Sequence, residues 1–263
     1  LTGLLRDLKL FFEINIKKDL YEQDINKFDF KFENNAQDVC PKVSFLKIDI
    51  DSIPETYNQE IENYFSDMDI KKNNFFTDIS NFISYETGQP THCYEAKSVQ
   101  SGLRLDFLKE KQQFKTLLGK TIEVNEGDLV FHNNNKIVNL AGVVGSECTS
   151  CNKNTKSVIL ECAYFVPEQI LGKAIKYSIN SDAAYKFERS VDPNCHDWVI
   201  RRFIRIVEQH TNIINLELCS NIHTSFQEKL IELDINKINN ILGTNISVNK
   251  CKKYLMILQL VLN

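Results

Sequence analysis

The spacing of hydrophobic residues changes along the chain from helical to strand-like and back again. Apolar side chains at helical spacing predict helices over residues 1–13, 54–65 and 75–87, and Gly88 stands where a left-handed helix cap is expected. The middle of the chain carries shorter apolar segments with glycines at the turns between them, which is typical of strands. The predicted strands cover residues 43–50, 103–107, 113–118, 121–124, 129–131, 137–138 and 157–165.

Helical spacing returns after Pro167 and indicates the fold class. It predicts a helix through residue 176, a second that begins at Asn180 or Ser181, and a longer amphipathic one over 196–210. The charged, Asn-rich segment after residue 13 is predicted to be a connector or an edge ribbon. Together these elements predict an α+β fold with a central antiparallel or mixed sheet and flanking helices.

Composition and charge exclude two broad classes of function. The chain has 43% hydrophobic and 25% charged residues, as ordinary globular proteins do. Its net charge of -4 excludes a generally basic surface for nucleic acid, although a local basic patch is still allowed. No apolar run reaches the roughly 18 residues of a membrane span, so no membrane partner is expected.

The cysteines indicate a reducing compartment rather than a disulfide framework. There are 8 of them at irregular spacing, and we expect them to be reduced, mostly buried and cytoplasmic. Cys148 and Cys151 form an isolated CxxC pair with no second pair and no His at ligand spacing. We therefore predict a loop there, and no metal site.

Glu161 is the residue for which a purely structural role is hardest to accept. It is the one charge in the apolar run from Val158 to Phe165. Burying a carboxylate costs several kcal/mol unless it is paired or reaches a cavity. Its position therefore predicts a polar spot in an apolar pocket, the usual composition of a small-molecule site.

Several other candidate residues can be explained by a structural role as well as by a functional one. His92, next to a proline turn, is more often a hydrogen-bonded structural histidine than a catalyst. Gly142 and Gly145 either permit a tight turn or let another group approach the backbone closely. Arg201, Arg202 and Arg205 share one side of a helix, which suits a phosphate contact or, more often, a solvated face. No P-loop, HExxH, GxGxxG or Ser-His-Asp pattern points to a familiar enzyme.

Taken together, several motifs give this chain a clear resemblance to one family. In order, they are Thr77–Phe82, Gly88–Glu95, Ala141–Ser146, Leu160–Pro167 and Ser181–Pro193. Their order and spacing resemble the β subunit of bacterial phenylalanyl-tRNA synthetase. The resemblance implies a B3/B4 editing domain over residues 38–213, the end of a B1-like module with a connector over 1–37, and the truncated start of a B5-like domain over 214–263. We therefore expect a piece of a longer polypeptide, because the chain starts in a helical pattern and ends in an apolar one.

The resemblance also implies an activity and its assembly. The B3/B4 module of this family hydrolyses tyrosine misattached to phenylalanine tRNA, while aminoacylation, which uses ATP and Mg²⁺, takes place in the partner α subunit. An apolar pocket shaped for phenylalanine rejects an analogue with an added hydroxyl only about a hundredfold, so a second site must remove the product. The implied partners are the α subunit, in an α2β2 heterotetramer, and tRNA(Phe); this piece needs no cofactor of its own.

Matching by motif assigns roles to particular residues. Glu161 corresponds to the residue that recognises the tyrosyl hydroxyl, since a buried carboxylate accepts that hydrogen bond and stays unpaired against phenylalanine. His92 and Asn81 join it as the catalytic candidates. The remaining substrate-binding candidates that border the aminoacyl group, the ester or the terminal adenosine are Pro90, Gly142, Gly145, Ser181 and Ala183. Glu188 and Arg189 are expected to clasp the wall formed by the last two of these. Lys71 is a further candidate, at a position where the family often has Arg or Lys.

Some positions depart from the family pattern. Ser181 and Ser80 replace Thr, Glu95 replaces Asp, and Ser146 and Ser190 replace Gly. Narrowing of the pocket by Ser146 is the expected way to lose activity. One alternative is therefore a scaffold module of the synthetase in which editing has decayed. A free-standing deacylase and a general RNA-binding module fit less well, because of the flanking pieces and the acidic composition.

Overall fold

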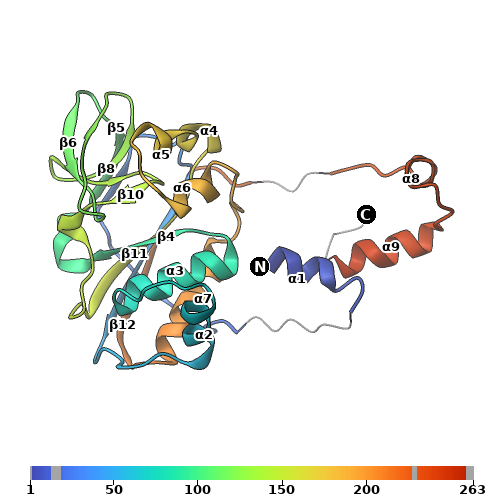
Figure 1. Ribbon diagram of the computed structural model, residues 1–263, viewed down its shortest axis with the longest axis horizontal. Coiled ribbons are helices and arrows are strands. Elements are labelled where there is room, and N and C mark those ends of the chain that lie inside the picture. Colours follow the sequence, from blue (N-terminus) through green and yellow to red (C-terminus); the bar gives the residue numbers. More distant parts are fainter. Residues whose placement is uncertain (1, 13–18, 227–229, 259–263) are drawn as a thin grey trace. The chain divides into compact units, whose positions relative to one another are not determined.

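The computed structural model describes residues 2–12, 19–226 and 230–258 (Figure 1). The chain divides into two compact units. The larger one comprises Asp19–Ser225, and the smaller one combines Leu1–Lys18 with Phe226–Asn263.

The smaller unit consists of short helices in its described parts. These are α1 (Thr2–Leu8), α8 (Ile235–Leu242) and α9 (Val248–Ile257). The side chains of Asp234 and Ser247 accept hydrogen bonds from the first turns of α8 and α9, and α8 ends at Gly243 in the left-handed conformation. None of the described residues of this unit is buried. The helix predicted over 1–13 is longer than the observed α1, which ends at Leu8. Positions 1 and 13 lie outside the described residues.

The first sheet of the larger unit contains five strands in the order β1-β12-β3-β11-β4. β1 and β12 are parallel, and the other pairs are antiparallel. Glu161 lies opposite Phe45 of β3 on one side and His92 of β4 on the other. The strands are β1 (Asn26–Lys27), β3 (Lys42–Ile50), β4 (Thr91–Glu95), β11 (Ser157–Tyr164) and β12 (Ile213–Ile222).

The second sheet is also mixed, with the order β10-β9-β8-β5-β2. β2 runs parallel to β5, while the remaining neighbours are antiparallel. A separate hairpin pairs β6 (Gln112–Lys115) with β7 (Thr121–Val124). The strands of the second sheet are β2 (Phe32–Asn34), β5 (Leu103–Phe107), β8 (Leu129–Asn133), β9 (Lys136–Leu140) and β10 (Val144–Gly145).

Helices α2, α3 and α7 lie together along the first sheet (Figure 1). They are α2 (Gln59–Asp67), α3 (Phe75–Thr87) and α7 (His196–Glu208). Their apolar faces join Val158, Leu160 and Cys162 of β11 in one buried core, which leaves the alternate residues of that strand on its opposite face. The shorter helices are α4 (Pro167–Ile170), α5 (Lys173–Lys176) and α6 (Asp182–Phe187), with 3-10 turns at Ala96–Val99 and Glu147–Thr149.

The arginines of α7 form hydrogen bonds and ion pairs within the protein, and Arg202 is the buried one. Arg202 is buried and donates to the carboxylates of Glu60 and Glu86. Arg201 donates to backbone carbonyls of the segment before β1, and Arg205 pairs with Asp19 of the same segment. These residues are therefore structural ties between α7, its neighbouring helices and the start of the unit, and neither a phosphate site nor a simply solvated face.

The predicted α+β class is confirmed, with two mixed sheets where one central sheet was expected. The strand prediction missed β4, β10 and β12, whereas β1 and β2 are edge strands of the two sheets, as the edge-ribbon alternative for the segment after residue 13 predicted. The helix predicted after Pro167 is divided into α4 and α5, because Gly172 between them adopts a φ of 74°.

The larger unit extends past both ends of the range 38–213 expected for the editing domain. β1 and β2 come from the expected connector, and each pairs with a strand of the larger unit. β12 comes from the range expected for the B5-like piece, but pairs with β3 from Ile213 to Ile222. The assignment of the flanking ranges to B1-like and B5-like modules stays a prediction.

Candidate functional site

A small pocket lies beside Glu161, between β11 and β4 of the first sheet and β9 and β10 of the second. Its volume is about 60 Å³. Apolar side chains form much of the wall, and its polar residues are Thr91 and His92 of β4, Asn139 of β9 and Glu161 of β11. The complete lining is Pro90, Thr91, His92, Asn139, Gly142, Val143, Val144, Gly145, Glu161, Ala183 and Phe187.

Glu161 is a buried carboxylate that has no cationic partner in the described part of the chain. Its exposed fraction is 5%, and no ion pair of the described residues involves it. Burial raises the pKa of Glu161 to about 7, and a hydrogen bond from Tyr94 acts against that rise. The carboxyl group therefore titrates close to neutral pH, which makes its charge sensitive to whatever enters the pocket.

Tyr94 provides the hydrogen bond that Glu161 does have. Its hydroxyl lies 2.6 Å from Oε2 of Glu161, and Asn139 donates to the same hydroxyl across 3.0 Å. Tyr94 is fully buried, and burial together with the neighbouring Glu161 raises its pKa well above the ordinary value. The hydroxyl thus keeps its proton at any physiological pH.

His92 forms the wall next to Glu161. Its ring packs edge-on against Tyr94, with 4.5 Å between ring centroids. Nε2 is buried and has no hydrogen-bond partner among the described residues. Burial lowers the pKa of His92 to about 4, so the imidazole is neutral at neutral pH and can accept a proton or a hydrogen bond.

Gly142 and Gly145 allow neighbouring side chains to lie close to the backbone. A Cβ on Gly145 would lie 2.6 Å from Nε2 of His92, and closer still to the adjacent ring carbon. Gly142 has a φ of 70°, and a Cβ there would meet Ile170 at 2.8 Å. Neither position accepts a larger residue without movement of the wall.

The start of α6 forms the opposite wall. Ala183 lines the pocket, but Ser181 does not. The Ser181 hydroxyl instead donates to the carbonyl of Val143 across 2.6 Å and accepts from the Ala184 amide, so it caps α6 and ties it to the pocket wall. Glu188 pairs with Arg189, which also donates to the carbonyl of Tyr185, and these contacts hold the last turn of the helix.

The structure brings together most of the predicted site residues, but not all of them. Pro90, His92, Gly142, Gly145, Glu161 and Ala183 share the pocket. Asn81 is exposed on α3 and Lys71 is exposed in the segment before that helix, and neither lines the pocket. Ser146 is not part of the wall either: its hydroxyl donates to the carbonyl of Lys115 across 3.2 Å. The expected narrowing of the pocket by Ser146 is not observed.

Sequence reasoning missed Tyr94 and Asn139. Asn139 is the single polar residue in the apolar run from Ile137 to Leu140, which is the signal that identified Glu161. Tyr94 had no such signal, since its segment was not predicted to be a strand. The alternation within β4 places His92 and Tyr94 on one face, two residues apart.

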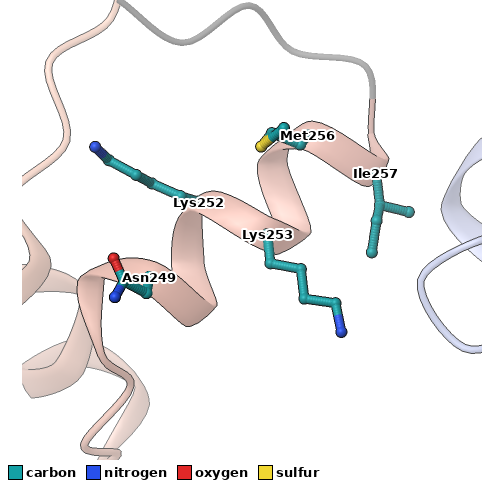
Figure 2. Close-up of a pocket in the computed structure, with 5 residues that line it drawn as sticks. All are labelled: Asn249, Lys252, Lys253, Met256 and Ile257. Atoms are coloured by element: carbon teal, nitrogen blue, oxygen red, sulfur yellow. The ribbon is translucent and has the colours of Figure 1, made fainter.

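Other hollows of the described residues have fewer features of a site. One is lined by residues of a single helix, α9, and Figure 2 shows Lys252 and Lys253 pointing away from each other there. Another lies beside Asp24 and Glu208 and has mostly polar walls. Within residues 2–12, 19–226 and 230–258, no cluster of His, Cys, Asp and Glu could hold a metal ion. No helix in the same ranges is long and apolar enough to cross a bilayer.

Comparison with known proteins gives a consistent result. Residues 47–212 match the model of the B3/4 domain family. The phenylalanine–tRNA ligase β subunit of Francisella tularensis is 31% identical over 66% of this chain and 22% of its own length. That of Chlamydia abortus is 35% identical over 59% of this chain and 20% of its own length. The Bacteroides fragilis β subunit is 26% identical over 98% of this chain and 33% of its own length.

The chain therefore spans about a fifth to a third of the length of these curated relatives. Among solved structures, an N-terminal fragment of the phenylalanyl-tRNA synthetase β subunit from Pyrococcus horikoshii aligns with a TM-score of 0.46 and 9% sequence identity. That alignment covers 94% of this chain and 69% of the other.

Proposed function

This chain belongs to the B3/4 domain family, and we propose that it is the editing part of a phenylalanine–tRNA ligase β subunit, which hydrolyses Tyr-tRNA(Phe) after transfer. The observation that carries the proposal is the placement of Glu161. It is a buried carboxylate with no cationic partner among the described residues, and it faces a pocket with otherwise mostly apolar walls. Such a group gains most from a ligand that brings a hydrogen-bond donor.

Recognition of tyrosine over phenylalanine follows from the cost of leaving a buried acceptor unpaired. The two aminoacyl groups differ by one phenolic hydroxyl, which can donate to the carboxylate of Glu161. A phenylalanyl group in the same position would displace water and leave the carboxylate without that partner. Sites built around a hydroxyl reject the analogue that lacks it far better than an apolar pocket rejects an added hydroxyl.

His92 is the proposed polar group beside the ester. Its imidazole is neutral at neutral pH, and its buried Nε2 has no partner within the described residues, so it can hold the attacking water or the ester oxygen. Pro90, Gly142, Gly145 and Ala183 shape the aminoacyl pocket around it. Ser181 acts through its bond to Val143. The exposed Asn81 and Lys71 are assigned to contacts with the tRNA outside the pocket.

The proposed assembly follows the same family. The β subunit would pair with an α subunit in an α2β2 heterotetramer in the cytoplasm and bind tRNA(Phe). Activation of phenylalanine, with ATP and Mg²⁺, belongs to the α subunit of that holoenzyme. The editing step of this chain is the attack of water on an ester, for which no cofactor is proposed.

One observation favours a second function, that of a scaffold module whose editing has decayed. The pocket volume of about 60 Å³ is well below the roughly 300 Å³ at which ligand pockets usually begin. Editing therefore requires the wall at α6 or at the turn around Gly142 to move when the aminoacyl group enters. A scaffold has no such requirement.

The deciding experiment is deacylation of Tyr-tRNA(Phe) and Phe-tRNA(Phe) by the β subunit that contains this chain, in complex with its α subunit. We expect selective release of tyrosine, and at least tenfold less selectivity with Glu161→Gln, which keeps the shape and removes the charge. Glu147→Gln, an exposed position outside the pocket, is the matched control. If the unaltered protein releases both amino acids only at the background rate, the editing function is contradicted and the scaffold function is supported.

A further inference from the structure

Glu161 ends a short chain of buried hydrogen bonds that the proposed function does not by itself require. Asn139 Nδ2 lies 3.0 Å from the Tyr94 hydroxyl, which in turn lies 2.6 Å from Oε2 of Glu161. Three different strands, β9, β4 and β11, supply these groups. Asn139 and Glu161 line the pocket, whereas Tyr94 lies behind them, fully buried.

Elementary donor and acceptor chemistry fixes the direction of this chain. When Glu161 is ionised, its carboxylate has no proton to give, so the single proton of Tyr94 points to Glu161. The hydroxyl oxygen is then an acceptor, and the Asn139 amide must present its N–H to it. Each group thereby orients the next, and the carboxylate is held by one of its two oxygens.

Few other groups act on the charge of Glu161. His92, opposite it on β4, is neutral because burial lowers its pKa to about 4. The buried thiols of Cys40 and Cys162 are neutral too, because burial raises the pKa of both well above the ordinary value. Tyr94 is consequently the side chain of the described residues that hydrogen bonds to the carboxylate and favours its ionised form.

We propose that Tyr94 is a positioning residue for Glu161: its hydroxyl holds Oε2, and the other oxygen, Oε1, is left to accept a hydrogen bond from a phenolic hydroxyl in the pocket. That the ligand is a tyrosyl group rests on the proposed function. That Tyr94 acts on the orientation and ionisation of Glu161 rests on the hydrogen bond between the two side chains, which favours the ionised carboxylate.

Removal of the Tyr94 hydroxyl has a directional consequence. In Tyr94→Phe the ring and its packing against His92 remain, but the donor to Oε2 is lost. The carboxyl group then gives up its proton only at a higher pH, because the hydrogen bond that lowered its pKa is gone. Near neutral pH, discrimination between Tyr-tRNA(Phe) and Phe-tRNA(Phe) falls and returns as the pH is raised, because a rise of about one unit from a pKa of about 7 lowers the ionised fraction at pH 7 about fivefold.

Two measurements on the αβ complex test this. The first follows the infrared band of the protonated Glu161 carboxyl, isolated by subtraction of the Glu161→Gln spectrum, as the pH is varied. The second measures the pH profile of deacylation for both aminoacyl-tRNAs. Tyr57→Phe is the matched control, because Tyr57 also donates to a buried carboxylate, Asp78, across 2.7 Å, but lies outside the pocket.

The outcomes separate the two proposals. A higher infrared midpoint in Tyr94→Phe, with no change in Tyr57→Phe, supports the role of Tyr94 whether or not the protein edits. An unchanged midpoint overturns it. If the unaltered complex discriminates and the pH profile of Tyr94→Phe superimposes on its own, Tyr94 does not act on recognition. If the unaltered complex fails to discriminate, the editing function falls, and the infrared midpoint alone decides the role of Tyr94.

Discussion

Arg202 and Glu161 are both buried charges, but the fold treats them in opposite ways. The Arg202 side chain is 9% exposed and Glu161 is 5% exposed. Arg202 lies within ion-pair distance of Asp19, Glu60 and Glu86. Glu161 has one neutral hydroxyl and no cation within the described part of the chain.

The surroundings of Arg202 compensate fully for its burial. Burial alone would lower the pKa of Arg202, but the carboxylates of Glu86 and Glu60 outweigh it and the pKa is raised. For Glu161 burial is the larger influence, and the pKa rises to about 7. A charge that the fold neutralises by itself has a structural role. A charge left with one neutral partner is where a ligand can add the missing interaction.

The largest expected effect is that of removing the compensated charge. Arg202→Met leaves the partly buried Glu86 and its neighbours without their cation, and we expect a loss of about 3 to 5 kcal/mol in the free energy of unfolding. Urea unfolding measures it. Arg205→Met is the control: its side chain is 38% exposed, and exposed ion pairs contribute only about 0 to 1 kcal/mol. Equal effects of the two substitutions would contradict the distinction drawn for Arg202.

The next effect is a pH dependence that belongs to Glu161. Its pKa rises from the ordinary 4.5 to about 7 on folding, so between these values the folded protein binds a proton that the unfolded chain releases. The stabilisation from this proton is complete below pH 4.5 and is lost as the pH rises through about 7. Glu161→Gln does not titrate, so its stability relative to the unaltered protein should rise between pH 5 and pH 8, by on the order of 3 kcal/mol.

Urea unfolding of both proteins at a series of pH values measures this difference. Burial lowers the pKa of His92 to about 4 and that of His196 to about 3. Because of these two groups, the free energy of unfolding falls as the pH drops below the ordinary value of 6.5. Both histidines are present in the two proteins, so their contribution cancels in the comparison. Parallel stability curves would mean that Glu161 does not titrate in this range.

The long helices could be predicted from the sequence, but strand β12 could not. α3 begins after the capping Asn74 and ends at Gly88, as its apolar spacing and cap residues indicate. In β12, which runs from Ile213 to Ile222, Leu216 is the one buried residue, and the others are partly or fully exposed. Such a strand lacks the alternation that identifies a half-buried strand, and its pairing with β3 is a long-range property.

The candidate site shows the same limit. A carboxylate within an apolar strand identifies Glu161, because its burial is a local inference. Asn81 lies between the buried Ser80 and Phe82 but is itself exposed, so its side of α3 depends on how the helix packs. The contact between Tyr94 and Glu161 depends on the register of β4 against β11, which the sequence does not encode locally.

The smallest expected effect concerns how tightly the pocket wall packs around His92. Gly145→Ala places a Cβ 2.6 Å from Nε2 of His92, so the imidazole must move. Crowding of this kind costs about 1 to 3 kcal/mol in well-packed regions, and we expect about 1 to 2 kcal/mol because the pocket gives the ring some space. Urea unfolding measures the loss, and deacylation of Tyr-tRNA(Phe) should fall with it if His92 acts in the pocket.

The clash with His92 can be separated from any other effect of the added methyl group by a double-mutant cycle. In a His92→Ala background the ring is absent, so Gly145→Ala should cost little beyond its contact with Leu117, which lies 3.2 Å from the new Cβ. A coupling free energy close to the whole cost of Gly145→Ala then assigns that cost to the imidazole. If the substitution costs as much without the ring as with it, the glycine serves the backbone of β10, and the pocket has more freedom around His92 than its packing indicates.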